Sequence, residues 1–377
     1  MPPSRARAAR CRARSARRCR AGRRARRVGR QPVRASRAPR RRRSEHAPAA
    51  RAPPARASAA RVRPLRDRAS HRCAGAGTSG ASVGNRPRGP GVGPLVRFGI
   101  NISTSAGPGA DPVAAAQRAE ALGFDFVSAS DHLHGSHPTF ETWTLLAWIA
   151  ARTARIQIVS NVLGLPYRAP AVIAKMGESL ARLSGGRYVL GLGAGGSDDE
   201  FRAFGLPVRT AGEKVDALEE ALTIVRGLWS GAEYSFEGEH YATHGARLEP
   251  KPDAPIPIWL GVYGRRSLTL AGRYADGWLP SLPYAPPAVV PEMRDRVRSA
   301  AEAAGRDPAA LTFAYNLGVH VGSGVRSERV VSGNPAEVVE RLREIADLGF
   351  DTLNFWPVGN EAEQAEALAR EVVPHLA

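Results

Sequence analysis

Hydrophobic and polar positions follow one repeating rhythm from residue 96 to the end of the chain. A short apolar run gives way to a polar loop, and the loop leads into a segment whose apolar residues recur at helical spacing. In the first unit, VRFGINI (96–102) alternates as a strand does. The following segment, DPVAAAQRAEALGF (111–124), opens with an Asp-Pro helix start and closes near Gly123.

Seven further units repeat this pattern. The predicted strands cover residues 124–132, 156–164, 187–196, 257–262, 277–281, 311–322 and 351–358. The predicted helices after them cover residues 140–153, 169–185, 211–229, 265–276, 286–305, 334–349 and 361–376. The segment 232–250 interrupts the rhythm and is predicted to form a hairpin with Gly238 near its turn.

Alternating strands and helices predict an α/β fold with a parallel sheet covered by helices. Eight units within residues 96–377 favour a (β/α)8 TIM barrel over an open doubly wound sheet. Such barrels carry their active sites at the carboxyl ends of the strands. The candidate site residues are therefore Asn101, Asp131, His132, Asn161, Val162, Gly193, Ala194, Gly195, Gly196, Gly261, Tyr263, Trp278, Asn316, Asn354 and Trp356. Amide, aromatic and glycine residues dominate this set, which suits a flat heteroaromatic ligand.

Composition divides the chain at residue 95. Residues 1–95 hold 28 arginines, no lysine and two acidic residues, whereas residues 96–377 hold 26 basic and 33 acidic side chains. The basic tail lacks apolar periodicity and is expected to be disordered, because it cannot bury enough surface to offset the entropy lost on ordering. Three interpretations stay open: a nucleic-acid-binding arm, a transit peptide, or translated GC-rich DNA upstream of a true start at Val96. The composition favours the third, and the acidic core is not expected to bind nucleic acid.

All three cysteines lie in the tail, at spacings that fit no zinc pattern. A core without cysteine has no disulfide scaffold or thiol nucleophile and is consistent with a reducing cytoplasm. The sequence shows neither an apolar run of the ~20 residues that a membrane span needs nor a signal peptide.

The segment GLGAGGSDDEF (191–201) joins a predicted strand to a helical turn through glycines. Backbone N–H groups exposed in this way can hold a phosphate, but glycines also serve plain tight turns, and both interpretations stay open. The segment is neither a nucleotide P-loop nor a dinucleotide fingerprint.

The stretch SDHLHGSH (130–137) places three histidines and an aspartate close together. His134 and His137 fall in a Gly/Ser/Pro loop, where a solvated histidine is the ordinary outcome. A metal site needs three or four converging ligands, and no other strand end clearly supplies them. Asp131 and His132 lie at the expected barrel mouth, where a histidine can donate or accept protons near neutral pH.

Five segments together resemble the bacterial luciferase-like monooxygenase superfamily, and most closely its actinobacterial branch of coenzyme F420-dependent oxidoreductases. They are LGFDFVSASDHLH, FETWTLLAWIAARTARIQIVSNVLGLPYRAPAVIAKM, LSGGRYVLGLGAGGSDDEFRAFG, PIWLGVYGRRSLTLAGRYADGWLP and AEAAGRDPAAL. The resemblance covers essentially all of residues 96–377 and none of the tail.

The resemblance implies a cofactor that lies across the barrel mouth with its ring against the end of the third strand. Behind the ring the family has a non-proline cis peptide, and the matching bond joins Asn161 and Val162. Asp131 and His132 match the family's Asp-His pair, with the histidine near the reactive edge of the ring. We hypothesise that His132 is the acid/base partner and that Asp131 orients it.

The resemblance also implies contacts to the cofactor's phosphate and side chain. The matching residues are Gly193, Ala194, Gly195, Gly196 and Ser197, and a second segment runs from Gly261 to Arg265. Arg168 and Arg265 are expected near the anionic tail of the cofactor.

Two departures from the family pattern matter. The family's sugar-phosphate dehydrogenase has a catalytic glutamate at the position of Gly196, so that activity is not expected. Related sequences read Gly-Gly where this chain reads GVYG (261–264).

The sequence therefore predicts an F420-dependent oxidoreductase acting on a small-molecule substrate, without a metal or membrane partner. The resemblance also implies that the protein is a homodimer. The alternatives are an FMN-dependent monooxygenase using reduced flavin and O₂, a nucleic-acid-binding protein, and a metal-dependent barrel isomerase or hydrolase.

Overall fold

The protein is described by a computed structural model that covers residues 96–376, except positions 134 and 136. The predicted tail (residues 1–95) and His134 lie outside the described residues.

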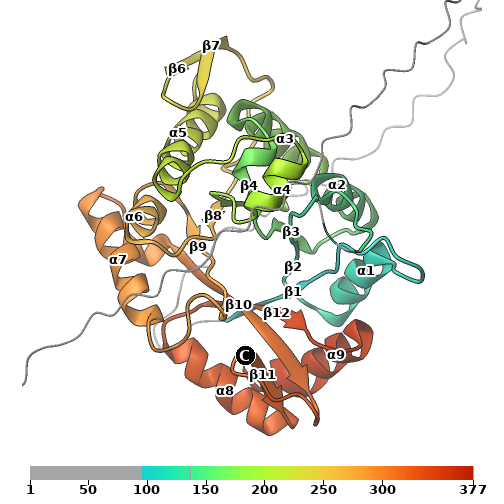
Figure 1. Cartoon of the computed structure of the whole chain (residues 1–377). Coiled ribbons are helices and arrows are strands. Elements are labelled where there is room, and N and C mark those ends of the chain that lie inside the picture. Colours follow the sequence, from blue (N-terminus) through green and yellow to red (C-terminus); the bar gives the residue numbers. More distant parts are fainter. Residues whose placement is uncertain (1–95, 134, 136, 377) are drawn as a thin grey trace, which may run out of the picture. The chain divides into compact units, whose positions relative to one another are not determined.

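Eight parallel strands close into a barrel (Figure 1). β1 pairs with both β2 and β12, so the sheet has no open edge between its first and last barrel strands. The barrel strands are β1 (Arg97–Asn101), β2 (Phe126–Ala129), β3 (Gln157–Ser160) with β4 (Leu163–Gly164), β5 (Tyr188–Gly193), β8 (Ile258–Leu260), β9 (Gly277–Trp278), β10 (Thr312–Val321) and β12 (Thr352–Pro357). The predicted TIM barrel is confirmed.

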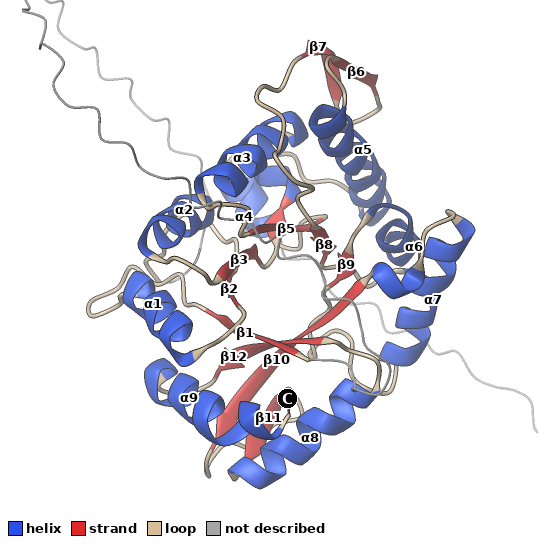
Figure 2. Ribbon diagram, turned by 180° about the vertical axis from the view of Figure 1, so that it is seen from behind, coloured by secondary structure: helices blue, strands red, loops and turns tan. Residues whose placement is uncertain are grey.

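Helices form a ring around these strands (Figure 2). They are α1 (Pro112–Leu122), α2 (Thr142–Arg152), α3 (Pro170–Leu183), α5 (Ala211–Ser230), α6 (Arg265–Tyr274), α7 (Val290–Ala303), α8 (Pro335–Asp347) and α9 (Glu361–Ala367). The predicted ends of α1 are confirmed: Asp111 accepts a hydrogen bond from the Ala114 amide, and Gly123 closes the helix at a φ of 88°. Capping boxes begin α5 at Thr210 and α8 at Asn334.

The helical turn predicted after the glycines of 191–196 is the short helix α4 (Asp198–Ala203). Three short elements were not predicted: β11 (Val330–Gly333), which pairs with β10, and the 3₁₀ turns η1 (Leu165–Tyr167) and η2 (Pro308–Ala310). The last predicted helix does not run unbroken to 376, because a π turn η3 (Leu368–Val372) and a 3₁₀ turn η4 (Val373–His375) follow α9. The predicted hairpin is confirmed as β6 (Tyr234–Glu237) and β7 (Ala242–Ala246), with Gly238 between them.

The inside of the barrel is filled by an apolar layer. Its side chains are Phe126, Val159, Val189, Trp259, Leu279 and Ala314, all almost completely buried. On four of these strands the residue two positions further along is polar. The four polar residues are Ser128, Asn161, Ser281 and Asn316. Since alternate side chains of a strand point to the same face, a polar layer lies above the apolar one at the carboxyl ends of the strands.

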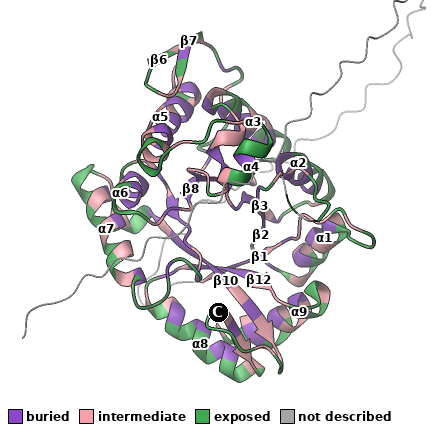
Figure 3. Cartoon of the chain, in the orientation of Figure 1, coloured by how far each residue is buried: buried purple, intermediate pink, exposed green. Residues whose placement is uncertain are grey.

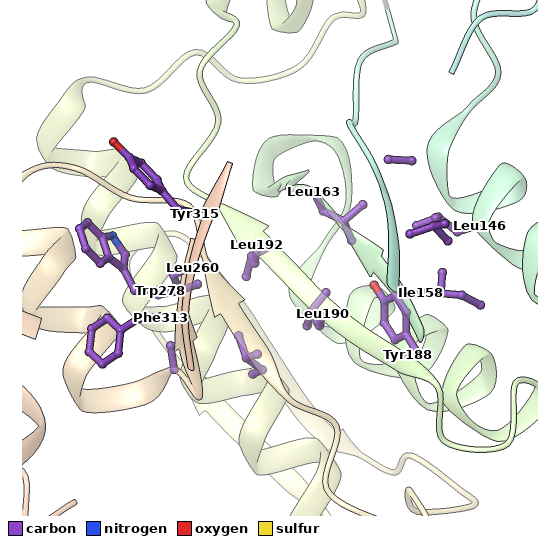
Figure 4. Close-up of a cluster of buried hydrophobic side chains, with 14 of the residues drawn as sticks. Leu146, Ile158, Leu163, Tyr188, Leu190, Leu192, Leu260, Trp278, Phe313 and Tyr315 are labelled. Carbon is purple, nitrogen blue, oxygen red and sulfur yellow. The ribbon is translucent and has the colours of Figure 1, made fainter. Parts of the chain in front are cut away.

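A larger apolar core lies between the strands and the helices. Figure 3 shows buried positions concentrated on the strands and on the inner faces of the helices. Trp278 belongs to this outer core: its ring stacks at 6.1 Å on Phe350, and its Nε1 donates to the Val262 carbonyl at 2.9 Å. It lies beside Phe313 and Tyr315 in Figure 4. Its expected place in the barrel mouth is therefore wrong, because Leu279 is the neighbour that points inward.

Two leucines offer a matched test of this outer core. Leu146 on α2 is 1% exposed, whereas Leu183 at the end of α3 is 83% exposed. Leu146→Ala should lower the free energy of unfolding by about 2–5 kcal/mol, because it leaves a cavity among packed side chains. Leu183→Ala should change it by less than about 0.5 kcal/mol. Urea unfolding of both variants measures the difference, and equal effects would contradict this packing.

Candidate active site

A network of neutral side chains joins the carboxyl ends of the strands. Asn161 and Asn316 exchange two amide hydrogen bonds, of 2.9 and 3.1 Å. Asn354 donates to the Asn316 side-chain oxygen at 2.7 Å. Ser128 and Asn354 are also paired, since the Asn354 amide donates to the Ser128 hydroxyl at 2.8 Å. We call the side chains of Asn101, Ser128, Asn161, Ser281, Asn316 and Asn354 the polar floor.

The polar floor carries no charge of its own. Ser128 donates to the Asn101 oxygen at 3.1 Å, and Asn316 donates to the Ser281 hydroxyl at 3.1 Å. Trp356 adds its indole N–H, 3.4 Å from the Asn316 oxygen. Because amides both donate and accept, this surface suits a flat polar ring with mixed donors and acceptors.

The peptide bond between Asn161 and Val162 is cis, as the resemblance implies. It divides the predicted strand 156–164 into β3 and β4. Val162 packs on the apolar layer of the barrel. A Cβ added at Gly193 would lie 2.8 Å from a Val162 methyl, and one at Gly261 would lie 3.1 Å from both. A side chain at Gly193 would therefore force Val162 to move, and one at Gly261 would press closely against it.

Asp131 is buried in a charged network. Its side chain is fully shielded from solvent, and its carboxylate accepts hydrogen bonds from Arg168 at 2.7 and 3.2 Å. The Gly164 amide donates to the same carboxylate at 3.0 Å. Arg168 also contacts Glu141. Although burial opposes its charge, these carboxylates raise the pKa of Arg168.

One expectation is corrected by this network. Asp131 does not orient His132, because both of its oxygens are engaged by Arg168 and Gly164. The Arg168 guanidinium pairs with two carboxylates, and its expected place near an anionic cofactor tail stays a prediction.

The carboxylate that contacts His132 belongs to Glu200, on α4. The distance from His132 Nδ1 to Glu200 Oε1 is 2.7 Å, while 53% of the His132 side chain remains exposed. Leu133 N donates to Glu200 Oε2 at 3.2 Å, and the Tyr167 hydroxyl donates to the same oxygen. Burial opposes ionisation of Glu200, but the hydrogen bonds from Tyr167 and His132 outweigh it and lower the pKa. Burial and the same hydrogen bond raise the pKa of Tyr167.

Glu200 was not predicted from the sequence as a site residue, because only the glycines of GLGAGGSDDEF (191–201) were considered. The acidic run that follows them, at the carboxyl end of β5, was the available signal. Of the glycines, Gly195 has a φ of 95°, and Gly196 is exposed with no atom within 4 Å of an added Cβ. Ala194 and Ser197 complete the loop into α4. Whether this loop holds a phosphate stays a prediction.

The model of the luciferase-like monooxygenase family matches residues 95–328. The chain belongs to this family. It is 31% identical over 332 residues to the F420-dependent glucose-6-phosphate dehydrogenase of Nakamurella multipartita, covering 75% of this chain and 97% of the relative. It is 38% identical over 269 residues to the F420-dependent hydroxymycolic acid dehydrogenase of Mycobacterium tuberculosis, covering 66% of this chain and 72% of that protein.

A solved structure shares the fold of this luciferase-like chain. It is an F420-dependent secondary alcohol dehydrogenase in complex with an F420-acetone adduct, with a TM-score of 0.68 and 18% identity. The similarity covers 75% of this chain and 99% of that one. At this identity it supports the barrel alone.

The second expected cofactor segment follows β8. Gly261 donates its amide to the Leu192 carbonyl at 3.1 Å, which ties this segment to the end of β5. Arg265 begins α6 and is exposed, and within the described part of the chain it makes no ion pair. It remains a candidate for an anionic group. Arg266, beside it, pairs with Asp216.

Within residues 96–376, positions 134 and 136 apart, no group of three or more His, Cys, Asp or Glu side chains is arranged to hold a metal ion. No helix in the same residues is long and apolar enough to cross a membrane. His137 is exposed, as predicted for the loop.

The buried ion pair of this luciferase-like protein predicts a large effect of one substitution. Asp131→Asn leaves Arg168 with one carboxylate fewer and should lower the free energy of unfolding by about 3 kcal/mol. The control Glu366→Gln removes the exposed pair with Arg118 and should change it by less than about 1 kcal/mol. Urea unfolding compares the two, and a minor effect of Asp131→Asn would refute the structural role.

Proposed function

We propose that this chain is a coenzyme F420-dependent oxidoreductase that transfers a hydride between the deazaflavin and a small substrate bearing a hydroxyl or carbonyl group. Membership of the family and relatives named as F420-dependent dehydrogenases support the coenzyme. The observation that carries the proposal is the imidazole of His132. It stands half-exposed at the carboxyl end of β2, with one ring nitrogen held by Glu200 and the other left for a substrate.

The residues present fit such a coenzyme. The polar floor would offer uncharged donors and acceptors to a flat ring, and Asn161 and Val162, joined by the cis bond, would support that ring. Gly193 and Gly261 leave room for the Val162 side chain. We assign the loop of Gly193, Ala194, Gly195, Gly196 and Ser197, together with Arg265, to the anionic part of the coenzyme.

When bound, the deazaflavin supplies hydride chemistry, and the protein supplies orientation and proton handling. Oxidation of a secondary alcohol to a ketone removes a hydride from carbon and a proton from oxygen. In our proposal Nε2 of His132 accepts that proton, since Nδ1 is engaged by Glu200. In the reverse direction the same nitrogen returns the proton to the carbonyl oxygen.

Cofactor titration separates this proposal from an FMN-dependent monooxygenase. We expect the purified protein to quench F420 fluorescence saturably and to bind FMN more weakly. His132→Ala should leave F420 binding unchanged and lower kcat by about 100-fold or more, because it removes the general base. Tighter binding of FMN would favour the monooxygenase, and wild-type turnover in His132→Ala would remove the role of the histidine.

Glucose 6-phosphate should be a poor substrate. The sugar-phosphate enzyme of the family has its catalytic glutamate where this chain has Gly196, and losing such a group costs about 100-fold or more in rate. We expect kcat/KM for F420 reduction by glucose 6-phosphate to be lower by that factor than for the best neutral secondary alcohol. Gly196→Glu is a direct probe, because its Cβ meets open space. Efficient use of glucose 6-phosphate by the wild type would overturn this substrate assignment.

We also propose that the protein is a cytoplasmic homodimer and that its core, residues 96–377, binds neither nucleic acid nor membranes. N-terminal sequencing of the native protein tests the interpretation of the tail as a nucleic-acid-binding arm: the native protein should begin near Val96 if residues 1–95 are translated upstream sequence, whereas a start near residue 1 would contradict that origin.

A further inference from the structure

The Glu200 carboxylate gathers three separate segments of the chain. Its Oε1 contacts Nδ1 of His132, and its Oε2 accepts from Leu133 N and the Tyr167 hydroxyl. His132 and Leu133 follow β2, Tyr167 ends η1, and Glu200 lies on α4. Both oxygens of an almost buried carboxylate are therefore engaged at once.

The chemistry of this contact fixes the position of a proton. Hydrogen bonds from Tyr167 and His132 offset burial and lower the pKa of Glu200, so the group is a carboxylate at neutral pH. An ionised carboxylate only accepts hydrogen bonds, so Nδ1 of His132 must carry a hydrogen. In the neutral imidazole the lone pair then lies on Nε2.

Tyr167 connects this carboxylate to the segment behind the cis peptide. η1 begins directly after β4, whose Gly164 amide is held by Asp131. The next residue after Tyr167 is Arg168, which is also bound to Asp131. The Tyr167 ring packs edge-on against Phe201, at 5.1 Å between centroids. The phenol is thus held by its packing on Phe201 and by its hydrogen bond to Glu200, and it helps to orient the carboxylate.

Stability alone does not account for the arrangement. Half of the His132 side chain is exposed, and a polar contact at such a site adds little to stability. What the contact does is select one tautomer and one orientation of the ring.

We propose that Glu200 and Tyr167 are positioning residues that hold His132 in the Nδ1–H tautomer, so that Nε2 faces the substrate as proton acceptor. The proposal rests on the function proposed above for His132. Glu200 and Tyr167 act through the imidazole and need not touch the substrate themselves.

The tautomer can be measured without coenzyme or substrate. Two-bond ¹H–¹⁵N correlation spectra of the ¹⁵N-labelled full chain at pH 8 distinguish the two nitrogens, with His132 assigned by its loss in His132→Ala. We expect Nδ1 protonated in the wild type and a shift toward Nε2–H in Glu200→Ala. His320, whose Nδ1 lies 2.8 Å from the Val358 carbonyl, is the internal control and should not change. An Nε2–H tautomer of His132 in the wild type overturns the proposal, whatever the coenzyme.

Kinetics test the consequence with conservative variants. Glu200→Gln should lower kcat by about 100-fold, as expected when a general base is misaligned, with KM and F420 binding unchanged. Glu200→Asp should restore part of this loss, and Tyr167→Phe should lower kcat by about 3–10-fold, the effect of one hydrogen bond. Asp199→Asn is the matched control, because the Asp199 carboxylate, next to Glu200 in the chain, is 96% exposed and pairs with Arg202 alone among the described residues. Wild-type kcat in Glu200→Gln would overturn the positioning role. Absence of F420 turnover in the wild type and in every variant would instead count against the proposed function.

Discussion

Closure of eight parallel strands is the constraint on which the rest of this structure depends. Once β1 pairs with β12, every strand must send alternate side chains into a shared interior. That interior is too narrow for anything but side chains, so the apolar layer around Trp259 fills it. One further step along the same strands brings Ser128, Asn161 and Asn316 together. The polar floor is therefore a consequence of strand pleat and barrel closure acting together.

Most of the fold could be predicted because its elements are long or well bounded. The caps at Asp111 and Gly123 are local signals, and they mark the helix wherever the chain folds. Shorter elements depend on their neighbours. α4 has only six residues and no apolar stripe, and β11 exists because β10 extends far enough to pair with it. β9 has two residues, too few for alternation to reveal that Trp278 faces outward.

The site was predicted in its positions but not in its pairings. His132, Asn161 and Val162 lie at strand ends, where the rule for barrels places them. The partner of each charged group comes from elsewhere in the chain: Arg168 is 37 residues from Asp131, and Glu200 is 68 residues from His132. Adjacent residues of an extended segment point in opposite directions, so Asp131 and His132 were poor candidates for a pair. The sequence alone does not show which distant side chain pairs with each of them.

The apolar layer also decides how ligands come and go. Among the described residues, Phe126, Val159 and Trp259 fill the inside of the barrel, so a ligand of the polar floor is expected to approach from the carboxyl ends of the strands. A coenzyme ring resting on the polar floor would be covered by whatever binds after it. In the proposed reaction the coenzyme and the substrate therefore enter from the same end of the barrel. The substrate binds after the coenzyme, and its product leaves first. Turnover is then expected to follow a compulsory order, imposed by the packing of side chains that never touch either ligand.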